Sequence, residues 1–563
     1  MNLLHDPWMP VRGAHGLRHW ITPDAMSDSR WLAFDADRPD FNGALAQFAI
    51  GLLQTTTTAA DAIDWRKLFN APPDAEELRR WFEPVAAAFE LDGDGPRFMQ
   101  DFDLGTEGVA VNEIGALLIP SPGEQTVKNN ADHFVKRALI TALCPACAAT
   151  ALFTLQLNAP SGGAGHRTGL RGGGPLTTLV LGPQGGHLWH ELWLNVRDRP
   201  AFLAQGGDAD RADPQRTFPW LGPITNLQAK DGEMAQSQVH PAHLYWAMPR
   251  RIRLDAGEPL AGACDGCGRH SEHLIRRCAS KNYGLNYKGA WSHPLSPYYE
   301  TKEGWLPVHP QPDGVGYRHW LGWVLGASGD KKSVRVAQIV DRAVAALQRQ
   351  TGGQLRLWAF GYDMDNMKAR CWYDATLPIY GLADCARDAR AAVQAEVARW
   401  LASAELASMY LRGAVKDAWF SADARGEFGH VDASFWGATE PHFYRHLQAF
   451  IEVARTGVDH PDLAVREAWH ATLIRTAMRL FDETFVGAGT IERQNPRRTA
   501  LAHKQLRKSL HGPKLRLALG LPVTEAQAKP ARKSARLSAP ASAPASAPAS
   551  APDSTSGPAT EAA

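Results

Sequence analysis

Two pairs of cysteines, each with two residues between them, are the most specific chemical feature of the sequence. Cys144 and Cys147 form the first pair, and Cys264 and Cys267 form the second. A Cys-x-x-Cys spacing lets two thiolates bend onto one ion, and tetrahedral zinc takes four such ligands. Residues 148–263 separate the pairs, whereas a self-contained zinc ribbon keeps its pairs roughly 15–20 residues apart. We therefore predict one structural zinc ion that joins distant parts of a single domain.

The alternatives for these cysteines are unrelated buried thiols or a redox-active motif. A redox motif accounts for one Cys-x-x-Cys pair and leaves the other unexplained. A zinc hydrolase or nuclease is a further possibility, but four thiolates fill every position of tetrahedral zinc and leave none for water. The sequence also contains no HExxH, GxSxG or P-loop motif.

A glycine-rich loop follows the first cysteine pair by one helix length. Residues 148–157 are apolar and predict a helix, which the sequence Asn-Ala-Pro at 158–160 ends. The loop at 162–165 lacks the lysine of a nucleotide-binding P-loop. Glycines have no Cβ atom, so their backbone amides can approach a surface such as a DNA groove closely. An ordinary turn is the alternative.

Length and composition indicate a globular protein with more than one domain: 563 residues, of which 44% are hydrophobic. Lys plus Arg (60) nearly equals Asp plus Glu (59), so any basic surface must be local. The N-terminus lacks signal-peptide features, and no run approaches the roughly 18 apolar residues of a membrane span. We expect a cytoplasmic protein without a membrane partner, in a compartment where thiols stay reduced.

Hydrophobic periodicity predicts an α+β protein with three parts. A large mixed α/β domain with the internal zinc site covers residues 1–385, and a four-helix bundle covers 386–520. Residues 521–563 form an Ala/Pro/Ser-rich tail. Because such a tract cannot bury apolar surface, the tail is predicted to be disordered.

The first domain shows both helical and strand periods. Residues 45–53 predict a helix, and 8–11 predict an edge strand, where a proline is tolerated. Alternating apolar residues predict further strands at 188–196 and 355–359. Residues 361–367 contain two aspartates without the spacing of an EF-hand, so a polar loop is expected there.

The second domain is predicted from three apolar stripes and one basic helix. The stripes cover 393–404, 443–451 and 473–481, and Thr439 is placed where the second helix would take its N-cap. The fourth helix, about 497–511, carries a row of cations. They are Arg497, Arg498, Lys504, Arg507 and Lys508. This basic face is a candidate DNA-facing surface, and a plain solvated face explains it equally well.

Two other segments combine lysine with aromatic residues. Phe134, Val135 and Lys136 lie in a basic loop within residues 121–143. Residues 281–289 interleave Lys and Tyr around glycines, which is typical of a hairpin tip able to meet a sugar–phosphate backbone. An ordinary exposed loop and an ordinary hairpin are the alternatives.

Several rarer motifs occur in one order along the chain. They are Asn2-Leu3-Leu4-x-Asp6-x-Trp8-Met9-Pro10-Val11, Gly169-Leu170-Arg171-Gly172-Gly173-x-Pro175-x-Thr177-Thr178, Trp291-x-His293-Pro294-x-Ser296-Pro297 and His442-Phe443-Tyr444-Arg445. Together with the separation of the cysteine pairs and the Ala-Pro before the glycine loop, they make residues 1–520 resemble a known family. This family is CasA, the large subunit of Cascade, the type I-E CRISPR surveillance complex.

The resemblance implies a non-catalytic DNA reader. In such complexes RNA–DNA pairing reads the target, while protein reads a short flanking motif, the PAM. The family reads that motif largely from the minor groove, where donor and acceptor patterns are degenerate, and helps to open the duplex. The implied partners are the other Cascade subunits with CRISPR RNA, target double-stranded DNA, and a recruited helicase–nuclease that performs the cutting.

The resemblance also assigns DNA-contacting positions in the first domain. The glycine loop that approaches the PAM corresponds to Gly162, Gly163, Ala164 and Gly165. Ala164 stands where the family commonly has glycine. The lysine of a second contact corresponds to Lys281, with Ser280 as the alternative one position earlier.

Two further sites are implied by the same resemblance. The wedge that opens the duplex beside the PAM corresponds to Asn366 and Met367, with Asn366 in place of the expected glutamine. The loop that docks at the guide-RNA end of the complex corresponds to Phe134, Val135 and Lys136.

Two other functions are compatible with the cysteine motifs. A free-standing zinc-stabilised DNA-binding protein would bind tightly and specifically alone, whereas a complex subunit would bind weakly until it is assembled with guide RNA. A zinc-dependent nuclease would cleave DNA as the purified chain.

Overall fold

The computed structural model describes most of the first 523 residues. The described residues are 1–122, 128–129, 139–183, 186–209, 213–228, 232–255, 257–289, 291–312, 314–328, 333–347, 353–365, 368–382, 387–420, 426–456, 463–487 and 495–523. Met1–Pro522 forms one compact unit. The predicted tail falls almost entirely outside the described residues, and the boundary predicted at 386 stays a prediction. No described helix is long and apolar enough to cross a bilayer.

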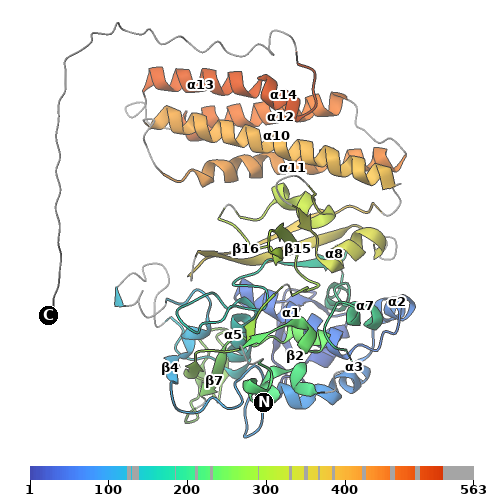
Figure 1. Ribbon diagram of the computed structural model, residues 1–563, viewed down its shortest axis with the longest axis vertical. Helices are drawn as coiled ribbons and strands as arrows, with labels where there is room; N and C mark the ends of the chain where they lie inside the picture. Colours follow the sequence, from blue (N-terminus) through green and yellow to red (C-terminus); the bar gives the residue numbers. More distant parts are fainter. Residues whose placement is uncertain are drawn as a thin grey trace, which may run out of the picture. The chain divides into compact units, whose positions relative to one another are not determined.

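The core of the N-terminal part is built around helix α1 (Pro39–Thr56), which confirms the helix predicted at 45–53. Nearly all of its residues are buried, because it is apolar around its whole circumference. Phe48 is fully buried, and its ring packs edge-on against other aromatic rings, including that of Phe153 in α5. Helix α5 (Pro145–Asn158) packs against α1 (Figure 1).

A three-stranded sheet near the N-terminus has β1 (Met9–Gly13) in its centre, between β2 (Arg18–Ile21) and β3 (Trp31–Phe34). The prediction of an edge strand at 8–11 is therefore wrong. Pro10 is tolerated because it lies just outside the β1–β3 ladder, where only its carbonyl is needed. That carbonyl accepts a 2.9 Å hydrogen bond from the Asp35 N–H.

The sheet that carries the candidate lysine has three antiparallel strands. Its central strand β10 (Arg277–Lys281) pairs with β4 (Ala110–Glu113) on one side and β7 (Arg251–Asp255) on the other. A separate two-stranded sheet pairs β6 (Glu233–Met234) with β11 (Asn286–Tyr287) in parallel.

A long hairpin dominates a third sheet. Strand β15 (Leu355–Asp365) pairs with β16 (Lys368–Ile379) and with β5 (Thr177–Leu181), which confirms the strand predicted at 355–359. The strand continues further than expected, so the polar loop predicted after it is wrong for its described part. Asp363 is buried in the strand, and Arg370 of β16 compensates its charge with an oxygen-to-nitrogen distance of 2.8 Å.

The strand predicted at 188–196 is instead the helix α6 (Leu188–Trp193). Trp189 and Trp193 lie one helical turn apart, both are fully buried, and their rings stack at 5.0 Å. Their indole N–H groups donate to the carbonyls of Leu68 and Trp65. The four-residue spacing of the tryptophans, rather than the alternation of the leucines, decides the structure.

Other elements of this part of the chain are shorter. They are α2 (Ala62–Asn70), α3 (Ala75–Phe82), α7 (Arg199–Leu203), β8 (Gly262–Ala263), β9 (His270–Ser271), β12 (Tyr298–Thr301), β13 (Gly304–Pro307), β14 (Val334–Arg335) and α8 (Gln338–Arg342).

The C-terminal part is helical, as its apolar stripes predict. Helices α10 (Arg387–Trp419), α11 (Gly429–Arg455), α12 (Leu463–Arg479) and α13 (Pro496–Leu510) run beside one another, followed by the short α14 (Pro513–Ala518) (Figure 1). Helix α10 contacts the other three long helices, and α11 contacts α12. The stripes of α10, α11 and α12 are buried between the helices.

Thr439 does not cap a helix, contrary to the prediction. Helix α11 starts ten residues earlier, at Gly429, and runs through both Thr439 and Pro441. The Thr439 hydroxyl donates 2.8 Å back to the Phe435 carbonyl and is 2.7 Å from the Tyr317 hydroxyl. The hydroxyl has hydrogen-bond partners inside the helix, so a threonine at this position does not require a helix N-terminus.

Candidate metal centre and nucleic-acid interface

The four predicted cysteines meet in one cluster. Their Sγ atoms all lie within 4.8 Å of one another. A tetrahedral zinc ion with Zn–S bonds of about 2.3 Å has S–S edges of about 3.8 Å. The distance between the Sγ atoms of Cys144 and Cys267 is 3.9 Å, so the cluster has the dimensions and the donor set of a tetrahedral thiolate site.

Two short structures place the cysteines. Cys144 precedes the first turn of α5, and Cys147 lies in that turn. Cys264 and Cys267 occupy the tight connection between β8 and β9. The Cys264 Sγ accepts hydrogen bonds from the backbone N–H groups of Cys144 (3.2 Å) and Gly266 (3.3 Å). Such N–H groups favour a thiolate over a thiol.

Glycines make the connection around the second pair compact. A Cβ atom on Gly266 would lie 3.2 Å from the Cys147 Sγ and 3.0 Å from a Leu143 methyl. Gly268 has a φ of +72°, which favours glycine. The Cys-Asp-Gly-Cys-Gly sequence is therefore fitted to a closed thiolate cluster.

The aspartate between the cysteines ties the two halves of the site together. The Asp265 carboxylate accepts hydrogen bonds from the backbone N–H groups of Thr141 (2.7 Å) and Ala142 (2.9 Å). The Thr141 bond is the largest cause that lowers the pKa of this carboxyl. The chain just before the first cysteine is thereby attached to the second pair.

Because the four sulfur atoms are close together, the pKa values of the four cysteines differ from one another. Hydrogen bonds from the thiols of Cys144 and Cys147 lower the pKa of Cys264, and they lower that of Cys267 to about 7. The hydrogen bond to Cys144 raises the pKa of Cys147. At least two sulfur atoms are thus suited to be the thiolates that a metal ion binds.

The glycine loop begins where α5 ends, and it is hydrogen-bonded to a distant segment. The Gly165 carbonyl accepts 2.8 Å from the Tyr283 N–H, and the Ala164 carbonyl accepts 2.9 Å from the Asn282 side-chain amide. These contacts join positions up to 118 residues apart. The structure therefore brings two sequence-predicted site segments, the glycine loop and the end of β10, onto one surface.

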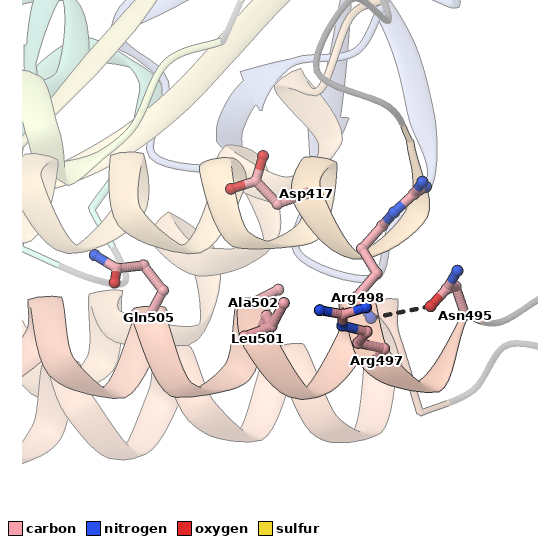
Figure 2. Close-up of a pocket in the computed structure, with 7 residues that line it drawn as sticks. All are labelled: Asp417, Asn495, Arg497, Arg498, Leu501, Ala502 and Gln505. Atoms are coloured by element: carbon pink, nitrogen blue, oxygen red, sulfur yellow. Dashed lines mark hydrogen bonds between the residues drawn. The ribbon is translucent and has the colours of Figure 1, made fainter. Parts of the chain in front are cut away.

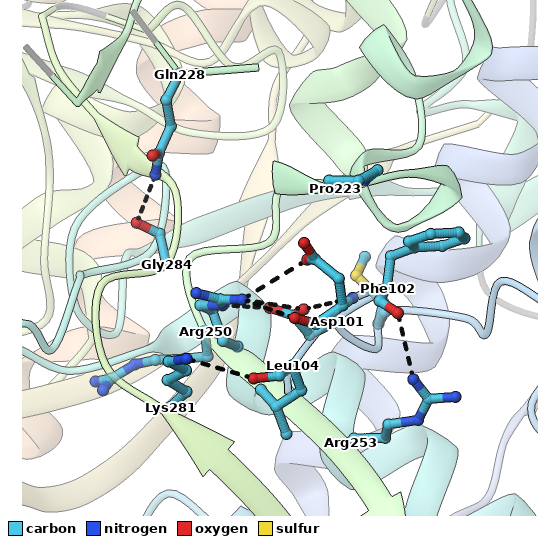
Figure 3. Close-up of polar contacts among 12 residues, drawn as sticks. Asp101, Phe102, Leu104, Pro223, Gln228, Arg250, Arg253, Lys281 and Gly284 are labelled. Carbon is cyan, nitrogen blue, oxygen red and sulfur yellow. Dashed lines mark hydrogen bonds and ion pairs between the residues drawn. The ribbon is translucent and has the colours of Figure 1, made fainter. Parts of the chain in front are cut away.

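Lys281 is the last residue of β10, beside the glycine loop. Its Nζ lies 3.5 Å from the Leu104 carbonyl (Figure 3). The alternative position, Ser280, points to the other face of the strand and accepts 2.9 Å from the Asn112 amide. Of the two positions, Lys281 is thus the one whose side chain lies on the side of Leu104. Among the described residues, its Nζ has one hydrogen-bond contact, to that carbonyl.

The hairpin predicted at 281–289 is wrong. Strand β11 pairs with β6, not with β10, because the intervening chain turns into the protein. Gly284 is buried so tightly that a Cβ atom there would lie 2.0 Å from the Pro249 carbonyl oxygen. The Gln228 side chain donates 3.4 Å to the Gly284 carbonyl (Figure 3). Residues 282 and 283, next to Lys281, are exposed, whereas residues 284 and 285 are buried.

The glycines of the loop differ in what surrounds them. Within the part of the chain that the structure describes, nothing lies within 4 Å of a Cβ atom built on Gly163. A Cβ on Gly162 would lie 2.5 Å from the His166 Cβ, and one on Gly165 would lie 2.8 Å from the Asn282 Cβ. Gly165 also has a φ of +82°. Gly165 therefore shapes the loop, whereas Gly163 leaves an open approach for a partner.

Two groups of sequence-predicted residues lie outside the described residues. They are Asn366 with Met367, and Phe134 with Val135 and Lys136. The strands before and after the first group, β15 and β16, pair up to Asp365 and Lys368. The wedge and docking assignments remain predictions.

The basic helix α13 borders a groove of about 490 Å³ against α10 (Figure 2). Its lining residues are Asp417, Asn495, Arg497, Arg498, Leu501, Ala502 and Gln505. Asn495 caps α13 by accepting 3.0 Å from the Arg498 N–H. The Arg498 guanidinium lies 3.5 Å from the Trp419 carbonyl at the end of α10. Arg498 therefore contacts a neighbouring helix, which reduces the basic face that the sequence predicts.

Sequence reasoning gave no role to Arg171, which supports the turn behind the glycine loop. It is buried, and its guanidinium donates to the hydroxyls of Thr177 (3.0 Å) and Ser296 (2.9 Å) and to the Gln47 side chain. Burial lowers the pKa of this guanidinium to about 10. The rarer motifs of the sequence contain all three of Arg171, Thr177 and Ser296. Their membership in these motifs is the sequence signal that could have indicated the contact.

Solved structures of one class share this fold. CasA from Thermus thermophilus aligns with a TM-score of 0.63 at 16% identity, over 91% of this chain and 99% of that chain. Cse1 from Thermobifida fusca aligns with a TM-score of 0.66 at 16% identity, over 92% and 98%. A chain from a CRISPR RNA-guided surveillance complex aligns with a TM-score of 0.63 at 18% identity, over 91% and 99%. The fold is thus that of the CasA-type proteins.

The sequence itself makes the relationship more specific. The family model of CRISPR-associated protein Cse1 matches residues 2–480. Because this match spans most of the 563 residues, the chain belongs to the Cse1 family, the CasA large subunits of type I-E Cascade. The family that the rarer motifs resemble is thereby confirmed.

Proposed function

We propose that this chain reads the PAM of foreign double-stranded DNA as the non-catalytic large subunit of a type I-E Cascade. The observation that carries the proposal is the joining of the glycine loop to the segment after Lys281. We call residues 161–168 together with 281–283 the glycine-loop surface. On this surface, two segments that the sequence analysis names as candidate DNA contacts lie side by side.

The chemistry of the glycine-loop surface suits a minor groove. Gly163 presents backbone with open space around it, so amide groups can come within hydrogen-bond distance of base edges. Lys281 adds a cation whose one hydrogen bond within the described residues is the 3.5 Å contact with the Leu104 carbonyl. Because minor-groove patterns are degenerate, we expect recognition of a short and loosely specified motif.

We assign the other steps by family membership. Asn366 and Met367 are the proposed wedge that helps to open the duplex for guide-RNA pairing. Phe134, Val135 and Lys136 are the proposed docking loop at the guide-RNA end. The proposed partners are the other Cascade subunits with CRISPR RNA, and a recruited helicase–nuclease that cuts the DNA in antiviral defence in the cytoplasm.

We propose that zinc is the ion of the four-cysteine cluster. The cluster has thiolate ligands only, a tetrahedral size, and backbone N–H groups directed at one sulfur. Bound zinc would supply a structural cross-link between residues 144–147 and 264–267. Four sulfur ligands leave no position for a water nucleophile, which supports the non-catalytic assignment over a zinc nuclease.

The test is a binding screen of the assembled complex against DNA with a randomised flanking sequence. Enrichment of a short motif next to the paired region would support the proposal, and absence of any flanking preference would overturn it. The purified chain without the other subunits discriminates the alternatives. Tight specific binding by the chain alone would favour a free-standing DNA-binding protein, and cleavage by the chain alone would favour a nuclease.

A further inference from the structure

Tyr283 has an unusual backbone for an aromatic residue. Its φ is +63°, and its side chain is 58% exposed. A positive φ is costly for a bulky side chain, and such strain is found mostly at functional sites. Met99 also has a positive φ, but it is fully buried, so packing accounts for it. The ring of Tyr283 is exposed, so burial of the side chain does not offset this cost.

The glycine loop holds Tyr283 in this conformation. The Tyr283 N–H donates to the Gly165 carbonyl, and the Arg167 guanidinium carbon lies 5.7 Å from the centre of the tyrosine ring. Both ends of this contact therefore come from the glycine-loop surface. The ring therefore lies against Arg167 at the edge of that surface.

Arg167 has an unfilled capacity to donate. Its Nε is buried without a hydrogen-bond partner, and no carboxylate among the described residues forms an ion pair with it. Lys281, the other cation of this surface, likewise has no ion pair within the described part of the chain. A guanidinium without a carboxylate partner can bind an anion, and an exposed aromatic ring beside it can pack on an apolar surface. The pair therefore suits a ligand that carries an anionic group next to an apolar one.

We propose that Arg167 and Tyr283 form a clamp on the sugar–phosphate backbone of the duplex beside the recognised motif. Arg167 pairs with a phosphate, and the ring of Tyr283 packs on the adjoining deoxyribose. The inference rests on the proposed function, because it assumes that DNA lies on the glycine-loop surface. The clamp reads no bases, so it adds affinity equally for every flanking sequence.

The test uses the full-length chain assembled with the other subunits and CRISPR RNA, and measures binding to duplex target at several salt concentrations. Replacing Arg167 with Gln is expected to weaken binding about tenfold and to reduce the slope of log K against log salt by about 1. Arg167→Lys keeps the cation and is expected to keep the slope. An unchanged slope in the Gln variant would overturn the clamp, as would a loss confined to one flanking sequence.

A matched pair of variants tests the ring. Tyr283→Phe keeps the apolar face and is expected to bind like the wild type. Tyr283→Asn tolerates the positive φ but removes the ring, and is expected to bind more weakly on every flanking sequence. Equal binding by the two variants would contradict a role for the ring.

Lys281→Ala is measured in the same assay, to separate failure of the clamp from failure of the proposed function. If the wild type shows no flanking preference, the proposed function fails. If Lys281→Ala binds weakly while the Arg167 and Tyr283 variants bind like the wild type, only the clamp is refuted.

Discussion

The two ends of helix α5 carry the two candidate sites, and they are built in opposite ways. At its start, four side chains converge on one point, and their sulfur atoms lie within 4.8 Å of one another. At its end, the glycine loop is held by backbone carbonyls that accept from Tyr283 and Asn282. The first end can be fixed by a metal ion. The second exposes backbone to a partner.

This contrast shows how a fold separates stability from recognition. A thiolate–metal cluster is insensitive to small shifts in the surrounding chain, because strong bonds to one ion set its geometry. Backbone hydrogen bonds of modest net strength hold the glycine loop, so its shape depends on small residues and close contacts. Helix α5 connects the two, so the metal end can anchor the end with the glycine loop, for which we propose DNA contact.

Loss of the metal is expected to have the largest effect. Replacing both Cys144 and Cys267 with Ser removes one ligand from each pair. Structural zinc contributes about 10–16 kcal/mol in small zinc-finger peptides, so we expect a loss of at least about 3 kcal/mol in folding stability here. Bound metal, solubility and the thermal unfolding midpoint are the measurements. Cys371→Ser, at an exposed cysteine outside the cluster, is the control. Retention of metal by the double variant would show that the ligand assignment is wrong.

Acid is expected to destabilise the buried region around His243 and Tyr287. Burial lowers the pKa of His243 to about 3 from an ordinary 6.5, and its Nε2 lies 3.1 Å from the Tyr287 hydroxyl. As the pH falls below 6.5, His243 is protonated in the unfolded chain but stays neutral in the folded protein. The free energy of unfolding therefore decreases as the pH falls, until about pH 3. This amounts to about 2 kcal/mol lost between pH 7 and pH 5.

Denaturant unfolding at several pH values measures this loss. His243→Gln cannot titrate, so the variant is expected to be less stable at pH 7 and to lose less stability on acidification. Acid sensitivity equal to that of the wild type would show that His243 is not the group responsible.

Two glycines of the loop offer a smaller and sharper contrast. Gly163→Val adds a side chain in open space, so folding should be unchanged while duplex binding falls about tenfold, or about 1.4 kcal/mol. Gly165→Ala places a Cβ against Asn282 and strains a positive φ, so it should distort the loop and also lower the unfolding midpoint. Binding of PAM-bearing duplex and thermal unfolding are measured for both. Wild-type binding by Gly163→Val would show that DNA does not approach this glycine.

The metal end could be predicted from the sequence, because its chemistry resides in side chains with a characteristic spacing. Cys144, Cys147, Cys264 and Cys267 are ligand types whose two pairs have few other uses in a reducing compartment. The helix between the sites was equally predictable, since an apolar run from 148 ends at an Asn-Ala-Pro sequence. Side-chain identity and local period were sufficient for both.

The structure of the glycine-loop end could be predicted only in part. The composition of 281–289 is compatible with a hairpin, and only tertiary contacts show the chain turning inward at Gly284. The contact between Arg167 and Tyr283 could not be predicted from a local pattern, because the two residues lie 116 positions apart in the sequence. Similarly, Leu188 to Val196 fit a strand period until the packing of Trp189 and Trp193 selects a helix. When the local sequence pattern is compatible with two secondary structures, long-range packing determines which of them forms.

Recognition of intact duplex by the glycine-loop surface is the proposal on which the others depend. Lys281→Ala in the assembled complex is the decisive experiment, with binding measured on PAM-bearing duplex and on a target already unwound. We predict roughly tenfold weaker binding to the duplex and wild-type binding to the unwound target. Equal loss on both substrates, or no loss on the duplex, would contradict recognition at this surface.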